Sequence, residues 1–100
     1  MSAYAIFIRD RMIDPDEMTT YSELARKARG DNPPKLLALY GAHETLEGLA
    51  ADGVVLLEFP DMAAAKAWYN SPAYQEALKH RKRGADYRVV LVEGFTPPPA

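Results

Sequence analysis

Three short proline-marked signals divide this chain and limit the folds that are open to it. Asp14-Pro15 and Ser71-Pro72 each place a small polar side chain directly before a proline, the preferred pairing for an N-cap and a first helical residue. Pro60-Asp61 ends an apolar segment and supplies the cap of another helix. The signals at Asp14 and Asp61 follow strand-like runs, so the sequence predicts strands that alternate with helices.

An apolar stripe at helical spacing follows each of these starts. The first helix is predicted from Pro15 to just before Gly30, with Glu17 completing a capping box. The second begins after Asp61, and Ser71 restarts it as a run that continues to Gly84. The stripes comprise Met18, Tyr21, Leu24, Ala25 and Ala28, then Met62, Ala65, Trp68 and Tyr69, then Tyr74, Ala77, Leu78 and Arg81.

Four segments rich in β-branched, aromatic or leucine residues are predicted as strands: residues 3–9, Lys35 to about Glu44, Gly53 to Phe59, and Tyr87 to Glu93. The middle two lie close enough along the chain to pair as an antiparallel hairpin. The order strand, helix, strand, strand, helix, strand predicts an α+β fold. It is the ferredoxin-like split βαβ (βαββαβ) arrangement, an antiparallel sheet with its helices on one face.

One sheet face stays bare in such a fold, and its candidate residues Val54 and Leu56 are apolar. An apolar face of that extent is expected to be covered by a second copy, so the sequence predicts a homodimer. The two sheets would then lie face to face in a dimeric α+β barrel. With 100 residues there is room for one core, predicted as a single domain over residues 1–95. Residues 96–100 are predicted to form a flexible, proline-rich tail.

Composition narrows the classes of function. Twelve basic and fourteen acidic residues give a net charge of −2, which predicts no nucleic-acid partner and no membrane partner. The absence of cysteine excludes thiol chemistry and cysteine-based metal sites, and the sequence predicts no cofactor and no metal. The apolar stretch Ala3–Ile8 is too short for a signal sequence, so a cytoplasmic location is expected.

Three polar residues could carry chemistry. Glu58 shares a strand face with Val54 and Leu56, where an apolar setting would raise its pKa and make it a general acid or base. Pairing with an arginine is the commoner role of such a carboxylate and is the favoured interpretation. His43 could act as a base near neutral pH, or could simply bind a neighbour. Arg81 is aimed at the boundary between helix and sheet, where it could hold a carboxylate ligand or Glu58.

The segment from His43 to Glu47 reads H-E-x-x-E, an incomplete version of a zinc motif that needs a sustained helix. Gly41 and Gly48 bracket it, so no metal site is predicted there. Tyr21, Trp68 and Tyr74 are candidate walls of a small-molecule pocket, and they serve equally well as core residues.

Several segments together resemble a known family. They are Glu58-Phe59-Pro60, the stretch from Trp68 to Gln75, Arg81, and Val90 to Gly94. The chain is similar to small bacterial proteins that share domain of unknown function 1330, in the dimeric α+β barrel superfamily. The resemblance implies a ferredoxin-like fold and a dimer, and it leaves the activity open. The family pattern has a glycine pair where this chain has Tyr40-Gly41.

Two hypotheses of function remain. The first is a homodimer that binds a small organic molecule in an aromatic-lined pocket between sheet and helices, walled by Tyr21, Trp68 and Tyr74. Glu58, His43 and Arg81 would carry any cofactor-independent acid–base, oxygenase or isomerase chemistry. The alternative is a non-catalytic dimer that binds a metabolite or another protein, in which all of these residues are structural. Whether the chain is an enzyme stays open at this point.

Overall fold

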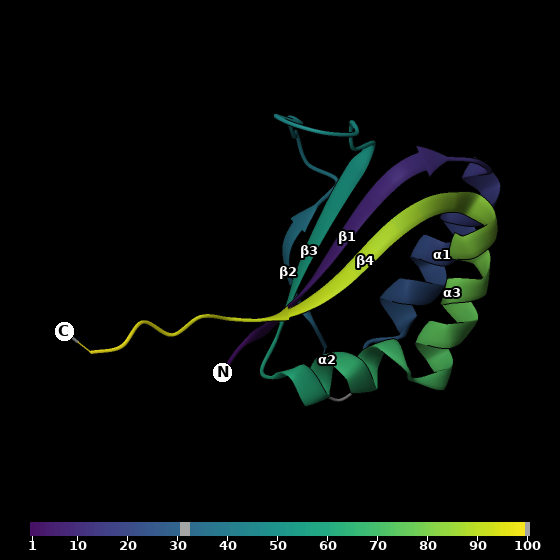
Figure 1. Cartoon of the computed structure of the whole chain (residues 1–100). Helices are drawn as coiled ribbons and strands as arrows, with labels where there is room; N and C mark the ends of the chain where they lie inside the picture. The colour runs from purple at the N-terminus through teal and green to yellow at the C-terminus, as the bar shows by residue number, and fades with distance from the viewer. Residues whose placement is uncertain (31–32, 100) are drawn as a thin grey trace.

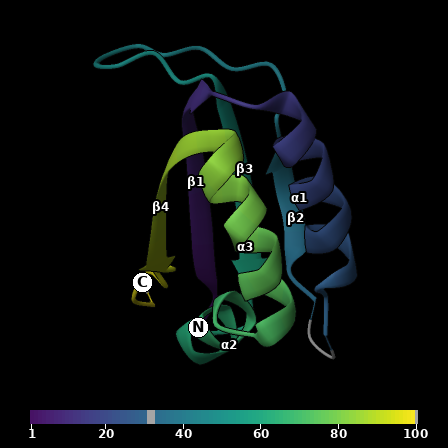
Figure 2. The same ribbon diagram turned by 90° about the vertical axis from the view of Figure 1, so that its right-hand side faces the viewer.

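The computed structural model describes residues 1–30 and 33–99. An antiparallel sheet of four strands carries three helices on one of its faces (Figures 1 and 2). The strand order is β2-β3-β1-β4, which confirms the predicted ferredoxin-like arrangement. The elements are β1 (Ala3–Met12), α1 (Pro15–Lys27), β2 (Lys35–Leu39), β3 (Gly53–Phe59), α2 (Met62–Tyr69), α3 (Pro72–Gly84) and β4 (Ala85–Glu93).

The helices begin where their caps predict. The Asp14 carboxylate accepts a hydrogen bond from the backbone N–H of Asp16, the Asp61 carboxylate from that of Ala64, and the Ser71 hydroxyl from that of Tyr74. Glu17 does not complete the predicted capping box. Its carboxylate reaches across to α3, where His80 Nδ1 lies 2.6 Å away, and so it joins α1 to α3.

Strand alternation divides the sheet residues between two environments. Ala3, Ala5 and Phe7 of β1 face the helices together with Val55 and Leu57 of β3, and all five are buried in the core. The opposite face, called here the helix-free face, carries Ile6, Ile8, Val54, Leu56, Glu58, Val90 and Val92. None of the described helices covers this face, so the prediction of a bare apolar face is confirmed (Figure 1).

Three strand boundaries differ from prediction. β1 continues to Met12 instead of ending at Arg9. β2 ends at Leu39 instead of near Glu44, because Tyr40 has a φ of 51° and the extended backbone stops there. The chain then forms a loop over residues 41–52 that extends beyond the ends of the strands (Figure 2). β4 starts earlier than predicted, at Ala85, because α3 runs directly into it without a connecting loop. Beyond Glu93, the chain as far as Pro99 is irregular.

The helix layer is held together by a close approach between α1 and α3. A Cβ atom on Gly84 would lie only 2.9 Å from Met18 Sδ and 3.1 Å from the Met18 backbone nitrogen, so the glycine lets the two helices touch. The carbonyl of Gly84 also accepts hydrogen bonds from the N–H groups of Ile13 and Asp14. In the described part of the chain, none of the helices is long and apolar enough to cross a membrane.

Candidate functional site

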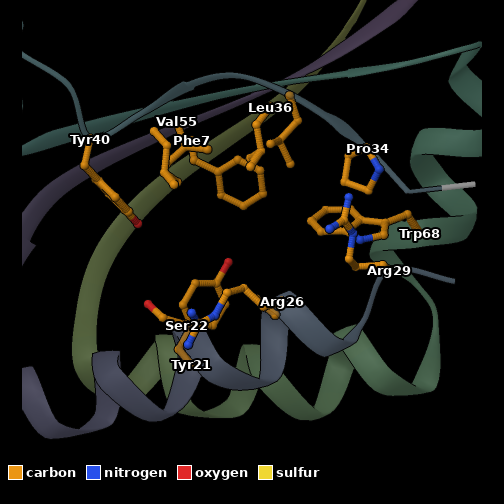
Figure 3. Close-up of a pocket in the computed structure, with 13 residues that line it drawn as sticks. Phe7, Tyr21, Ser22, Arg26, Arg29, Pro34, Leu36, Tyr40, Val55 and Trp68 are labelled. Atoms are coloured by element: carbon orange, nitrogen blue, oxygen red, sulfur yellow. The ribbon is translucent and has the colours of Figure 1, made fainter.

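A pocket of about 400 Å³, called here the aromatic pocket, lies between α1 and the sheet (Figure 3). In Figure 3, Phe7, Leu36 and Val55 extend from the sheet, Tyr21, Ser22 and Arg26 rise from α1, and Tyr40 and Trp68 stand at opposite ends. The remaining lining residues are Ala25, Arg29, Pro34, Leu39 and Leu57.

The pocket exists because β2 is an edge strand without a helix packed closely over it. α1 packs chiefly against α3, which leaves the helix-facing side of β2 uncovered. Leu36 and Leu39 consequently keep 58% and 57% of their surface exposed, an unusual state for large apolar side chains that point toward the helix layer. The pocket is therefore an unfilled part of the core, open at the sheet edge.

Two tyrosines that were predicted as pocket walls meet beneath the sheet. The hydroxyl groups of Tyr21 and Tyr74 lie 2.8 Å apart, and both side chains are buried. Burial raises the pKa of both phenols, with the neighbouring hydroxyl adding to this for Tyr21 and the charge of Arg81 opposing it for Tyr74. Both are therefore neutral near physiological pH. Tyr21 lines the aromatic pocket, whereas Tyr74 belongs to the core behind it.

Trp68 forms one end of the pocket and is fixed by the rings around it. Its indole lies 4.2 Å from the Tyr74 ring and 5.4 Å from the Phe59 ring, measured between ring centroids, and it meets Phe7 edge to face. The Trp68 Nε1 atom is buried, and it has no hydrogen-bond partner among the described residues. Burying an indole N–H without an acceptor costs free energy. This end of the pocket therefore lacks a hydrogen-bond acceptor for Trp68.

Tyr40 forms the other end of the pocket, directly after the last residue of β2. Its positive φ is one that glycine adopts easily and tyrosine adopts at a cost. The side chain offsets that cost through contacts: its hydroxyl is hydrogen-bonded to that of Tyr87, and the Arg9 guanidinium lies 4.7 Å from its ring centroid. Burial is the main reason that the pKa of Tyr40 is raised.

Arg81 lies at the boundary of helix and sheet, as predicted, and is only 5% exposed. Its guanidinium carbon lies 4.9 Å from the ring centroid of Tyr87, 5.6 Å from that of Phe7 and 5.9 Å from that of Tyr21. Within the described residues, no carboxylate oxygen lies within 4 Å of its side-chain nitrogens, and Arg81 Nε has no hydrogen-bond partner.

Glu58 lies on the other side of the sheet. It is opposite Tyr4 in β1 and Lys35 in β2, on the helix-free face, and is half-buried. Because residues that alternate along a strand point to opposite faces, a side chain that shares a face with Val54 and Leu56 cannot enter the helix layer. The structure does not bring Glu58 and Arg81 together within one chain.

His43 is equally remote from the aromatic pocket, in the exposed loop over residues 41–52. Its Nδ1 lies 3.1 Å from the carbonyl oxygen of Gly41 and its Nε2 lies 3.0 Å from that of Ala51. Both partners can only accept, so the ring satisfies both when it is protonated, and these bonds raise the pKa of His43. The described residues contain no cluster of three or more histidine, cysteine or acidic side chains arranged to bind a metal.

Among the lining residues that sequence reasoning did not predict as pocket walls, three bear most on the chemistry of the pocket: Tyr40, Arg26 and Arg29. The helical spacing held a signal for the two arginines. Arg29 follows Tyr21 and Ala25 at intervals of four, and Arg26 follows Ser22 in the same way, so both flank the apolar stripe of α1. Tyr40 gave no such signal, because its position depends on a turn that ends β2 early.

Solved structures share this fold. The chain is similar to the RPA0582 protein of unknown function from Rhodopseudomonas palustris (TM-score 0.72, 22% identity, covering 96% of this chain and 84% of that one). It is similar to a dimeric ferredoxin-like protein of unknown function from Thermobifida fusca (TM-score 0.63, 19% identity, 93% and 91% covered). It is also similar to SnoaB, a cofactor-independent oxygenase from Streptomyces nogalater (TM-score 0.57, 10% identity, 99% and 96% covered).

No curated protein matches the sequence significantly. A family profile does match it, over residues 2–95, and the family is described as a domain of unknown function, DUF1330. The match agrees with the resemblance carried by the segments around Glu58, Trp68, Arg81 and Val90. This chain therefore belongs to the DUF1330 family.

Proposed function

We propose that this protein binds a compact, largely planar organic molecule in the aromatic pocket. The observation that carries the proposal is an unfilled space of about 400 Å³, walled by the rings of Phe7, Tyr21, Tyr40 and Trp68, in the layer that should be core. A volume of this size is typical of small-ligand sites, which combine apolar walls with a few polar groups.

The polar groups of the pocket indicate which ligand it would take. Trp68 Nε1 is a donor without an acceptor, and Arg26 and Arg29 can only donate. The described lining contains no carboxylate. A ligand that carries an acceptor oxygen, such as an aromatic acid or a quinone, would complement these donors, whereas a cationic ligand would not.

We also propose that two copies pair through the helix-free face. Val90 and Val92 are 52% and 43% exposed there, next to Leu56 and Ile6, and a monomer rarely leaves such a face in water. The T. fusca protein of the same fold is dimeric, which supports the proposal. Pairing of this kind would bury the apolar residues of both sheets.

A second candidate is cofactor-independent oxygen chemistry on the bound molecule, as in the oxygenase of similar fold from S. nogalater. Glu58 and His43 stay candidates for its acid–base groups only if a second copy brings them to the pocket. An oxygen electrode tests it. Uptake of O₂ that depends on both protein and ligand, and that is lost in Glu58→Gln or His43→Gln, supports catalysis, and binding without uptake supports the non-catalytic alternative.

The binding proposal has a built-in reporter, because Trp68 is the one tryptophan of the chain. We expect aromatic acids or quinones that bind in the pocket to quench its fluorescence saturably and to raise the melting temperature. Ser22→Phe would fill the pocket from the exposed surface of α1 and weaken binding at least tenfold. Its matched control is Glu23→Phe, one residue further along the same helix and outside the lining.

Two results would contradict the binding proposal. One is a screen of aromatic acids and quinones in which no compound changes either the fluorescence or the melting temperature. The other is that every compound that quenches the Trp68 fluorescence binds Ser22→Phe as tightly as it binds the unchanged protein and Glu23→Phe, which would mean that none of them binds in the aromatic pocket.

A further inference from the structure

A second pocket, called here the arginine pocket, lies between the end of α3 and β4. It has a volume of about 350 Å³. Its lining residues are Tyr69, Arg81, Lys82, Ala85, Asp86, Tyr87 and Val89. None of the described residues lines both this pocket and the aromatic pocket, so the two are separate spaces on the helix side of the sheet.

The unusual feature of the arginine pocket is the state of Arg81. A guanidinium is always charged in a protein, and a charged side chain is almost never buried to this extent without an opposite charge. Arg81 is 5% exposed, and the described chain gives it no carboxylate within salt-bridge distance. Its buried Nε also has no hydrogen-bond partner among those residues.

The groups that surround Arg81 hold it in place without neutralising it. The faces of Phe7, Tyr21 and Tyr87 offer cation–π contacts, which stabilise a cation more weakly than a carboxylate in direct contact does. The other charges at the pocket do not compensate it either. Lys82 adds a second positive charge, and the carboxylate of Asp86 is already bonded to Arg11, with Oδ2 and Nη2 3.1 Å apart.

We infer that the arginine pocket is a binding site for a compact organic carboxylate, whose oxygens pair with the guanidinium of Arg81. The planar guanidinium can donate two parallel hydrogen bonds to the two oxygens of one carboxylate. Tyr69, Tyr87, Ala85 and Val89 offer apolar surface to the remainder of such a molecule. The exposed Lys82 stands at the same pocket and adds attraction for the anion.

The test uses the full chain and three sodium salts at matched ionic strength: benzoate, acetate and phosphate, each compared with chloride. We expect benzoate to raise the melting temperature saturably, with a weaker effect from acetate. Arg81→Met should weaken benzoate binding at least tenfold. Without added anion this variant should be no less stable than the unchanged protein, because an unpaired buried charge has been removed.

Arg83→Met is the matched control, since Arg83 lies on the same helix but is 61% exposed. It should keep the benzoate response. Arg81→Lys covers the case in which the methionine variant fails to fold: it retains the charge, loses the two-bond geometry and should still bind benzoate at least tenfold more weakly. In the unchanged protein, benzoate should shift the ¹⁵N resonance of Arg81 Nε and leave that of Arg83 unmoved.

Three outcomes would overturn the inference. Undiminished benzoate binding by Arg81→Met and Arg81→Lys would place the anion elsewhere. If phosphate and benzoate raise the melting temperature equally, the stabilisation is a general effect of anions and not the binding of an organic carboxylate. Dissociation of a dimer in Arg81→Met would assign the missing carboxylate to a second copy of the chain. In Ser22→Phe, which fills the aromatic pocket, the part of the benzoate response that Arg81→Met abolishes should persist, so the two proposed sites fail or succeed independently.

Discussion

Tyr21 and Tyr74 come from α1 and α3, and their hydroxyl groups are hydrogen-bonded to each other in the buried layer beneath the sheet. Each hydroxyl can serve as donor or acceptor, so a pair needs no third polar group. Burial holds both phenols in the neutral form, because an ionised oxygen would lose its hydration there. The pKa of each is raised for that reason, with burial as the largest cause.

This pair predicts a loss of stability in alkaline solution. A group whose pKa is higher in the folded chain than in the unfolded chain stabilises fully below the unfolded pKa, and that stability is lost as the pH rises above it. Unfolded tyrosine titrates near pH 10, so at pH 11 Tyr21 contributes a loss of about 1.4 kcal/mol, and Tyr74 adds to the loss in the same direction. Urea unfolding at pH 8 and pH 11, followed by circular dichroism, measures the change.

Tyr21→Phe/Tyr74→Phe is the control for this prediction, since replacing both hydroxyls leaves neither partner unsatisfied. Its stability should fall by at least about 1.4 kcal/mol less than that of the unchanged protein over the same pH interval. Equal losses in both proteins would mean that the pair does not resist ionisation and that other groups cause the alkaline transition.

At the scale of elements, the approach of α1 to α3 depends on Gly84. A methyl group there would meet the backbone of Met18, which cannot move without shifting the start of α1. We expect Gly84→Ala to destabilise the fold by about 1–3 kcal/mol, the usual cost of overpacking a core. The control is Gly41→Ala, where nothing lies within 4 Å of the added carbon. Urea midpoints measure both variants, and equal midpoints would contradict the prediction.

The elements also show which structural information is local in the sequence. The three helix starts could be predicted because a cap and its first turn lie within four residues of each other. The end of β2 could not, since it depends on the packing of Tyr40 against Tyr87 and Arg9, which are distant in sequence. The aromatic walls Tyr21 and Trp68 were accessible from helical spacing, whereas the separation of Glu58 from Arg81 required the orientation of the whole sheet.

At the scale of the molecule, the helix-free face is an apolar surface that none of the described helices covers. If two copies pair there, a lysine in place of Leu56 would have to be buried among Ile6, Val54 and Val90. We expect Leu56→Lys to weaken dimerisation on the order of a hundredfold, equal to about 2.8 kcal/mol. Analytical ultracentrifugation measures the dissociation constant.

Leu36→Lys serves as the control for the dimer prediction. Leu36 is an exposed leucine on the neighbouring strand, and it faces the helix side of the same sheet. This variant should remain dimeric. A monomer at all concentrations for the unchanged protein, or a dimer that tolerates Leu56→Lys, would show that the helix-free face has another role.

β1 lies in the middle of the sheet although it is the first strand of the chain: Ala3 pairs with Phe59 on one side and with Glu93 on the other. During translation, β1 is therefore synthesised first but can pair with β4 only after β4 has been synthesised. The apolar residues of β1 have only one of their two neighbours until Glu93 has left the ribosome, and contacts across so much sequence form slowly. The sheet can therefore close around β1 only after β4 is free to pair, and we expect this pairing to be a late step of folding.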